Sequence, residues 1–167
     1  MAFSGWAMAL QGRTAEGIGQ IREAIALHES IGARLERPLF LAALAESLSQ
    51  AGRLDEALVA TQDGLDRSRF TALRFHEPEL LSLKAEVLAE VSVSNFEQTE
   101  GCLREALKIT RETGAKSLEP RAALSLCRLQ GRTGKREERE MLASVVAQFS
   151  EGSAVKDFKE SMRLLQS

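Results

Sequence analysis

Charged side chains that recur about one repeat apart are the first candidates for chemistry in this chain. Glu46 and Glu86 lie 40 residues apart, and Arg128 follows 42 residues later. A pair of carboxylates can divide acid and nucleophile roles in a glycosidase when the two groups are about 5 Å apart. If 40 residues are one structural repeat, the two helices stack at roughly 10 Å, and we expect no catalytic carboxylate pair here.

Histidine and cysteine offer no better catalytic arrangement. His28 and His76 are far apart in sequence and lack a repeated acidic partner, so we interpret both as surface or helix-end residues. Cys102 and Cys127 lack the spacing of zinc ligands and are interpreted as reduced, buried thiols in a cytoplasmic protein. No set of Ser, His and Asp can be nominated as a triad.

The turn from Gly131 to Lys135 is superficially similar to a phosphate-binding loop. However, Arg136 stands where the motif needs Ser or Thr, and Leu129 stands where it needs its first glycine. We interpret this turn as a connection between two helices. The sequence therefore predicts no catalytic residue, no metal ligand and no cofactor site, and we do not expect this chain to be an enzyme.

The elements that would position these side chains are revealed by the three prolines of the chain. Pro38, Pro78 and Pro120 are 40 and 42 residues apart, and the residues after each proline repeat. The matching positions are Leu41, Leu81 and Ala123, then Ala45, Ala85 and Cys127, then Gly52, Ser92 and Gly134. A repeat of this length is one supersecondary unit copied along the chain, which predicts a solenoid.

Each unit has the pattern of two helices, called A and B here. Proline suits the first turn of helix A, and glycine then ends that helix. Acidic residues such as Asp55 and Glu56 suit the first turn of helix B, whose dipole is positive there. In the third unit, Ser94 and Glu97 predict a capping box.

These patterns predict an all-α, right-handed α-solenoid of four helix pairs with a period of about 40 residues. The units are expected at about 1–33, 34–73, 74–116 and 117–150, and a C-terminal capping helix within 151–167. Met1 aligns with Leu41, inside a helix A, so we expect the chain to continue a longer protein or to have been cut there.

Composition limits the class of partner. The 167 residues are 44% hydrophobic and 28% charged with a formal charge of −2, which is ordinary for a single globular domain. No run rich in Lys and Arg appears, so we expect no direct nucleic-acid binding. No apolar stretch approaches the roughly 20 residues that span a bilayer, and we expect no membrane contact.

The helix pairs resemble tetratricopeptide repeats. Gly52-Arg53-Leu54-Asp55-Glu56-Ala57-Leu58 matches a motif of that family, and small residues stand where helices A and B would cross. These are Gly5, Ala45, Ala85 and Cys127 in helix A, and Gly17, Ala57, Ala24 and Ala106 in helix B. The period exceeds the usual 34 or so residues and is similar to the longer helix pairs of the maltose-activator type.

Other segments resemble the C-terminal repeats of large bacterial signalling proteins. The segments are residues 5–12 (GWAMALQG), 114–119 (GAKSLE), 121–126 (RAALSL), 149–152 (FSEG) and 157–160 (DFKE). Such proteins join a nucleotide cyclase or a DNA-binding module to an AAA/STAND-type ATPase followed by repeats. The resemblance implies protein–protein interaction as the sensor or regulatory arm of such a protein. A stand-alone adaptor and, more remotely, an enzyme that uses the groove remain alternatives.

Tetratricopeptide geometry implies a binding groove lined by the A helices. The candidates are Trp6, Glu46, Ser49, Gln50, Glu86, Glu90, Arg121, Arg128 and Arg132. This set predicts a groove that is acidic in the middle and basic towards the end, for a protein or peptide of opposite polarity. The ligand could be an upstream domain of the same polypeptide. The apolar edge of the first unit, with Phe3, Trp6, Ala7 and Leu10, is compatible with a homodimer.

Overall fold

The computed structural model describes residues 1–71, 74–131 and 136–147, together with positions 161 and 163, and the regular structure of this part of the chain is entirely helical. The α-helices are α1 (Ala2–Leu10), α2 (Thr14–Ser30), α3 (Arg37–Gln50), α4 (Leu54–Thr71), α5 (Glu77–Val91), α6 (Phe96–Thr113), α7 (Glu119–Gly131) and α8 (Arg136–Ala147). Short 3₁₀ helices lie at Arg74–His76 (η1), Val93–Asn95 (η2) and Lys116–Leu118 (η3). The all-α prediction is confirmed.

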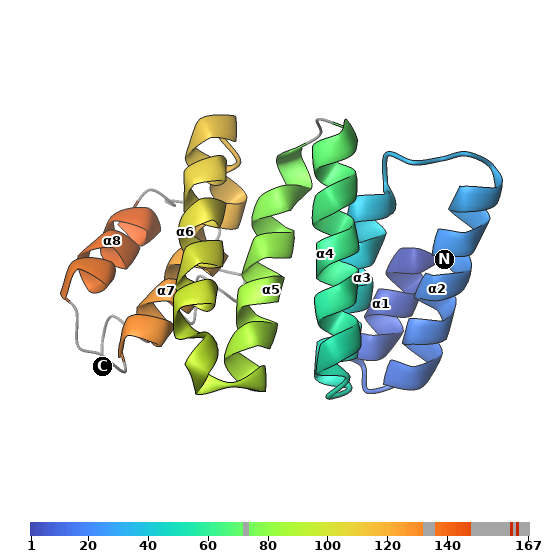
Figure 1. Cartoon of the computed structure of the whole chain (residues 1–167), viewed down its shortest axis with the longest axis horizontal. Helices are drawn as coiled ribbons and strands as arrows, with labels where there is room; N and C mark the ends of the chain where they lie inside the picture. The colour runs from blue at the N-terminus through green and yellow to red at the C-terminus, as the bar shows by residue number, and fades with distance from the viewer. Residues whose placement is uncertain (72–73, 132–135, 148–160, 162, 164–167) are drawn as a thin grey trace.

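The helices lie side by side in chain order, from α1 and α2 at one end to α8 at the other (Figure 1). Each α-helix packs against the next one along the chain, and α1, α3, α5 and α7 also contact one another in succession. The ranges expected for the four units each contain one odd-numbered and one even-numbered helix. The odd-numbered helices therefore form a shared wall, while the expected capping helix within 151–167 lies outside the described residues except at positions 161 and 163.

Proline and glycine bound the helices largely as the repeat predicts. Pro38 and Pro78 stand in the first turns of α3 and α5, where a missing N–H group leaves no helical hydrogen bond unmade. Gly52 follows α3 with φ of +70°, a left-handed conformation that strains side chains with a Cβ. Gly134, the equivalent glycine expected after α7, lies outside the described residues.

The predicted capping box at the start of the third helix B is wrong. Helix α6 begins at Phe96 after Asn95, whose side chain makes no cap hydrogen bond. Ser94 instead belongs to η2, where its backbone N–H donates to the Ser92 hydroxyl at 3.1 Å. The longer turn before this helix forms a 3₁₀ segment, which moves the helix start two residues beyond Ser94.

Small residues bring the two helices of a hairpin close together. Ala45 and Ala57 are fully buried, as are Ala85 and Ala106 in the third unit. In the first hairpin, a Cβ added to Gly5 would lie 2.7 Å from the carbonyl oxygen of Gly17, which is closer than real Cβ contacts. Because these residues have small side chains or none, the backbones of the two helices can approach closely at these positions.

Two main clusters of apolar side chains hold the row of helices together. One joins α2, α3, α4 and α5 and includes the buried Ile21 and Leu48, and the other runs from α3 to α8 and includes Leu80 and Leu103. Within the described residues, no helix combines the length and the apolar character that crossing a bilayer requires.

Candidate protein-binding groove

A groove of about 540 Å³ follows the wall formed by the odd-numbered helices. Its lining residues are Trp6, Leu10, Glu46, Ser49, Gln50, Leu83, Glu86, Val87, Glu90, Arg121 and Arg128. Of the candidates derived from the repeat, only Arg132 is missing from this lining, and Arg132 lies outside the described residues. The structure thus gathers the remaining eight candidates around one cavity.

The repeat explains why these side chains meet. Trp6, Glu46 and Glu86 each follow directly after a small residue that faces the even-numbered helix of the same hairpin. The next residue of a helix is turned by about 100°, so it points to a neighbouring face. Because successive hairpins repeat this arrangement, equivalent side chains fall in one row along the groove.

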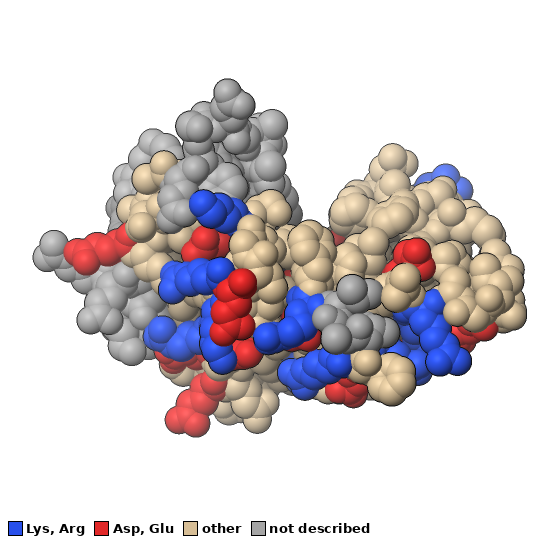
Figure 2. Space-filling model, turned by 90° about the horizontal axis from the view of Figure 1, so that it is seen from above, with Lys and Arg blue, Asp and Glu red and all other residues tan. Residues whose placement is uncertain are grey.

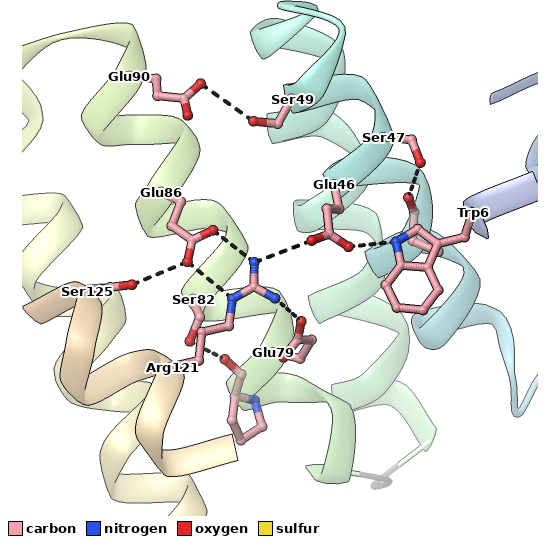
Figure 3. A network of polar contacts seen from close by, with 12 residues as sticks. Trp6, Glu46, Ser47, Ser49, Glu79, Ser82, Glu86, Glu90, Arg121 and Ser125 are labelled. Atoms are coloured by element: carbon pink, nitrogen blue, oxygen red, sulfur yellow. Dashed lines mark hydrogen bonds and ion pairs between the residues drawn. The ribbon is translucent and has the colours of Figure 1, made fainter. Parts of the chain in front are cut away.

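Arg121, at the start of α7, joins three carboxylates from two other helices (Figure 3). Its Nε donates to Oε1 of Glu86 at 3.1 Å and its Nη2 donates to Oε2 of Glu86 at 2.8 Å. Its Nη1 donates to Glu79, and Nη2 also lies 3.9 Å from Oε1 of Glu46. We call Arg121, Glu46, Glu79 and Glu86 the Arg121 cluster.

The Arg121 cluster keeps a largely buried guanidinium ionised. The Arg121 side chain is only 18% exposed, and burial by itself would lower its pKa. The hydrogen bonds that Arg121 donates to Glu86 and the charges of Glu79, Glu86 and Glu46 outweigh burial, so the pKa of Arg121 lies above its usual value. The guanidinium is therefore a permanent charge that ties α7 to α5 and α3.

The expected change of polarity along the groove is wrong at Arg121. We expected this residue to contribute to a basic end, but it lies among the central carboxylates and neutralises part of their charge. Glu79 was missed altogether. A signal for it exists, because Glu79 and Arg121 directly follow Pro78 and Pro120 and so occupy the same position in consecutive units.

Trp6 both packs against the core and lines the groove. Its Nε1 donates to Oε2 of Glu46 at 2.6 Å, and its half-buried ring packs against the cluster around α2, α3 and α4. This hydrogen bond joins the first hairpin to the second and fixes the edge of the ring relative to Glu46 (Figure 3). Phe3 and Leu10, from the edge expected to dimerise, are 54% and 53% exposed.

A second cavity of about 280 Å³ opens beside the groove between α5, α6 and α7. The two cavities share Glu86, Glu90 and Arg128. Across the groove, the Ser49 hydroxyl lies 3.5 Å from Oε2 of Glu90. Thr99 stands in the wall of the second cavity, and its buried hydroxyl has no hydrogen-bond partner within the described residues.

The histidines and cysteines are distributed without a common site. The His28 ring packs edge-on against Phe40 near the end of α2, with 4.8 Å between ring centres. Burial lowers the pKa of His76 in η1 and raises the pKa of the Cys102 thiol. Among the described residues, no three His, Cys, Asp or Glu side chains are arranged to hold a metal ion.

Charges of both signs are interspersed on the face that contains the connections from α2 to α3 and from α4 to α5 (Figure 2). At the connection from α2 to α3, Arg37 pairs with Asp63 at 3.2 Å, and at the connection from α4 to α5, Arg74 pairs with Glu112 at 3.4 Å. This face therefore offers a mixed surface, whereas the groove concentrates carboxylates.

Comparison with known proteins gives one informative similarity. No family model matches the chain. Over 126 residues, which are 75% of this chain, it is 27% identical to an uncharacterized protein of Rhizobium meliloti (strain 1021). The chain covers only 12% of that relative, which is therefore a much longer protein.

Proposed function

We propose that this chain is a protein-binding module, a right-handed α-solenoid of tetratricopeptide-like helix pairs whose groove binds a segment of a partner. The observation that carries the proposal is the convergence of eight side chains, chosen from the sequence with tetratricopeptide geometry as the guide, on one groove across four helices. A row of equivalent positions suits an extended ligand, because each hairpin contributes a contact at a regular interval.

The chemistry of the groove also suits a polypeptide. Leu10, which is 53% exposed, offers apolar surface beside carboxylates, a guanidinium and an indole ring. Mixed polar and apolar walls recognise a peptide by its side chains, and Trp and Arg are enriched among residues that dominate binding energy at interfaces.

We further assign the module to a longer protein as its regulatory or sensor arm, in a signalling ATPase, nucleotide cyclase or transcription regulator of bacteria. Two observations support this: the resemblance of several segments to such repeats, and the similarity to a piece of a much longer relative. A partner in the groove would then change the balance between two arrangements of the other domains, by its difference in affinity for the two.

A photo-crosslinking experiment tests the binding proposal. A photoreactive amino acid replaces Gln50, an exposed residue of the groove, or Val59, which is 70% exposed on α4. In the organism that encodes the chain, we expect a discrete crosslinked partner from position 50 and none from position 59. The purified partner should then bind the unmodified chain. Equal capture from both positions, or none from position 50, would contradict the proposal.

A further inference from the structure

The groove carries more negative than positive charge. Among the described residues that line it, the carboxylates are Glu46, Glu86 and Glu90 and the cations are Arg121 and Arg128, which leaves one negative charge in excess. Building on the proposed function, we infer that the bound segment carries a lysine or arginine whose cationic group lies against Glu46. The charge complementarity of the groove selects this occupant over an acidic or neutral segment.

Within the Arg121 cluster, Glu46 is the carboxylate that lies farthest from the Arg121 guanidinium. Glu86 receives two hydrogen bonds from Arg121, at 3.1 and 2.8 Å, whereas Glu46 lies 3.9 Å from the nearest guanidinium nitrogen. The other oxygen of Glu46 accepts the neutral Trp6 N–H at 2.6 Å. The charge of Glu46 is thus held in place by a hydrogen bond and left available to a second cation.

The surroundings of Glu46 suit the whole length of a basic side chain. The Trp6 indole, held by its bond to Glu46, can receive a cation against its ring. Leu10 lines the same groove, is 53% exposed and would contact the aliphatic stem of lysine or arginine. Half-buried walls screen the charge less than open solvent does, which strengthens its effect on an incoming cation.

An independent observation in the adjoining cavity points to a ligand. Thr99 is 2% exposed, and its hydroxyl has no partner within the described part of the chain. Buried polar groups are normally hydrogen-bonded. A donor group from a segment that extends from the groove past Glu86 and Glu90 would supply the missing bond.

Peptide selection followed by titration tests this inference. Random twelve-residue peptides displayed on phage are selected on the purified chain, and selected peptides without tryptophan are titrated by fluorescence. Trp6 is the single tryptophan and the chain has no tyrosine, so the signal reports on the groove itself. We expect peptides enriched in Lys and Arg, and weaker binding at higher salt.

Matched variants locate the cation. Glu46→Gln should weaken binding about fivefold, the upper range for one partly exposed ion pair. Glu23→Gln, the same change at an exposed site on α2, should leave binding unchanged.

Groove-binding peptides without basic residues, or equal affinities in the two variants, would overturn the inference and leave the proposed function standing. Failure to select any peptide that changes Trp6 fluorescence would contradict both.

Discussion

Replacing Arg121 should destabilise the fold far more than replacing an arginine that makes an equally short ion pair on the surface. Arg121→Gln removes the cation that faces Glu86, Glu79 and Glu46 and leaves three carboxylates close together. Removing one partner of a buried ion pair costs about 3–5 kcal/mol. Because the carboxylate side chains here are 24–36% exposed, we expect a smaller loss, about 2–3 kcal/mol.

Arg104 provides the matched control. Its Nη2 lies 2.6 Å from Oε1 of Glu100, but the side chain is 52% exposed and the pair lies within one helix. Arg104→Gln should therefore cost less than about 0.5 kcal/mol. Urea unfolding followed by circular dichroism measures both values, and thermal unfolding should show a drop of about 5–10 °C for the Arg121 variant.

A double variant checks the physical cause. If repulsion among the freed carboxylates causes the loss, adding Glu86→Gln to Arg121→Gln should restore part of the stability, a positive coupling between the two sites. Equal stabilities of the Arg121→Gln and Arg104→Gln proteins would refute the reasoning, since the Arg121 cluster would then contribute no more than a surface pair.

Three further predictions concern single positions. Gly17→Ala should lower the free energy of unfolding by about 1–3 kcal/mol, because the added Cβ would lie 2.8 Å from a backbone nitrogen of α1. Gly19→Ala should stabilise α2, because a Cβ at this position would point into open space. Thermal unfolding compares the two variants. Thr99→Val should leave the free energy of unfolding unchanged or raise it by up to about 1 kcal/mol, because the hydroxyl that it removes has no hydrogen-bond partner within the described residues. Thr110→Val should lower the free energy of unfolding, because it loses a 2.8 Å hydrogen bond. Urea unfolding distinguishes the two variants. Burial lowers the pKa of His76, so the unfolded chain takes up a proton first and stability falls as pH drops through about 6.5; His76→Gln should flatten this part of the stability–pH curve, and an unchanged slope would contradict the assignment.

The helices were predictable from sequence because the residues that begin and end them recur in each repeat. Proline in a first turn and glycine with positive φ at a helix end act locally, and Pro38, Pro78 and Gly52 serve those roles in the structure. The start of α6 was not predictable in this way. Ser94 and Glu97 fit a capping box, but the inserted turn folds as a 3₁₀ segment that draws Ser94 away from the helix start.

The positions of the groove residues were likewise accessible from the repeat phase, whereas their pairing was not. The position of a residue within the repeat indicates which face of a helix carries Glu46, Glu86 or Arg121, and those residues do line one cavity. Which carboxylates a long arginine side chain reaches depends on rotamers and on the offset between neighbouring helices. The sequence pattern therefore suggested separate acidic and basic regions, while the structure has Arg121 inside the acidic one.

The indole N–H resonance of Trp6 gives the most direct test of groove binding. A nitrogen-15-labelled chain with one tryptophan has one such resonance, and its proton is the one donated to Glu46. On saturation with the crosslinked partner or a selected peptide, we predict a shift of this resonance and of backbone resonances in α3 and α5. A saturated complex in which these signals stay unchanged, and only signals of α2, α4 or α6 move, would contradict binding in the groove.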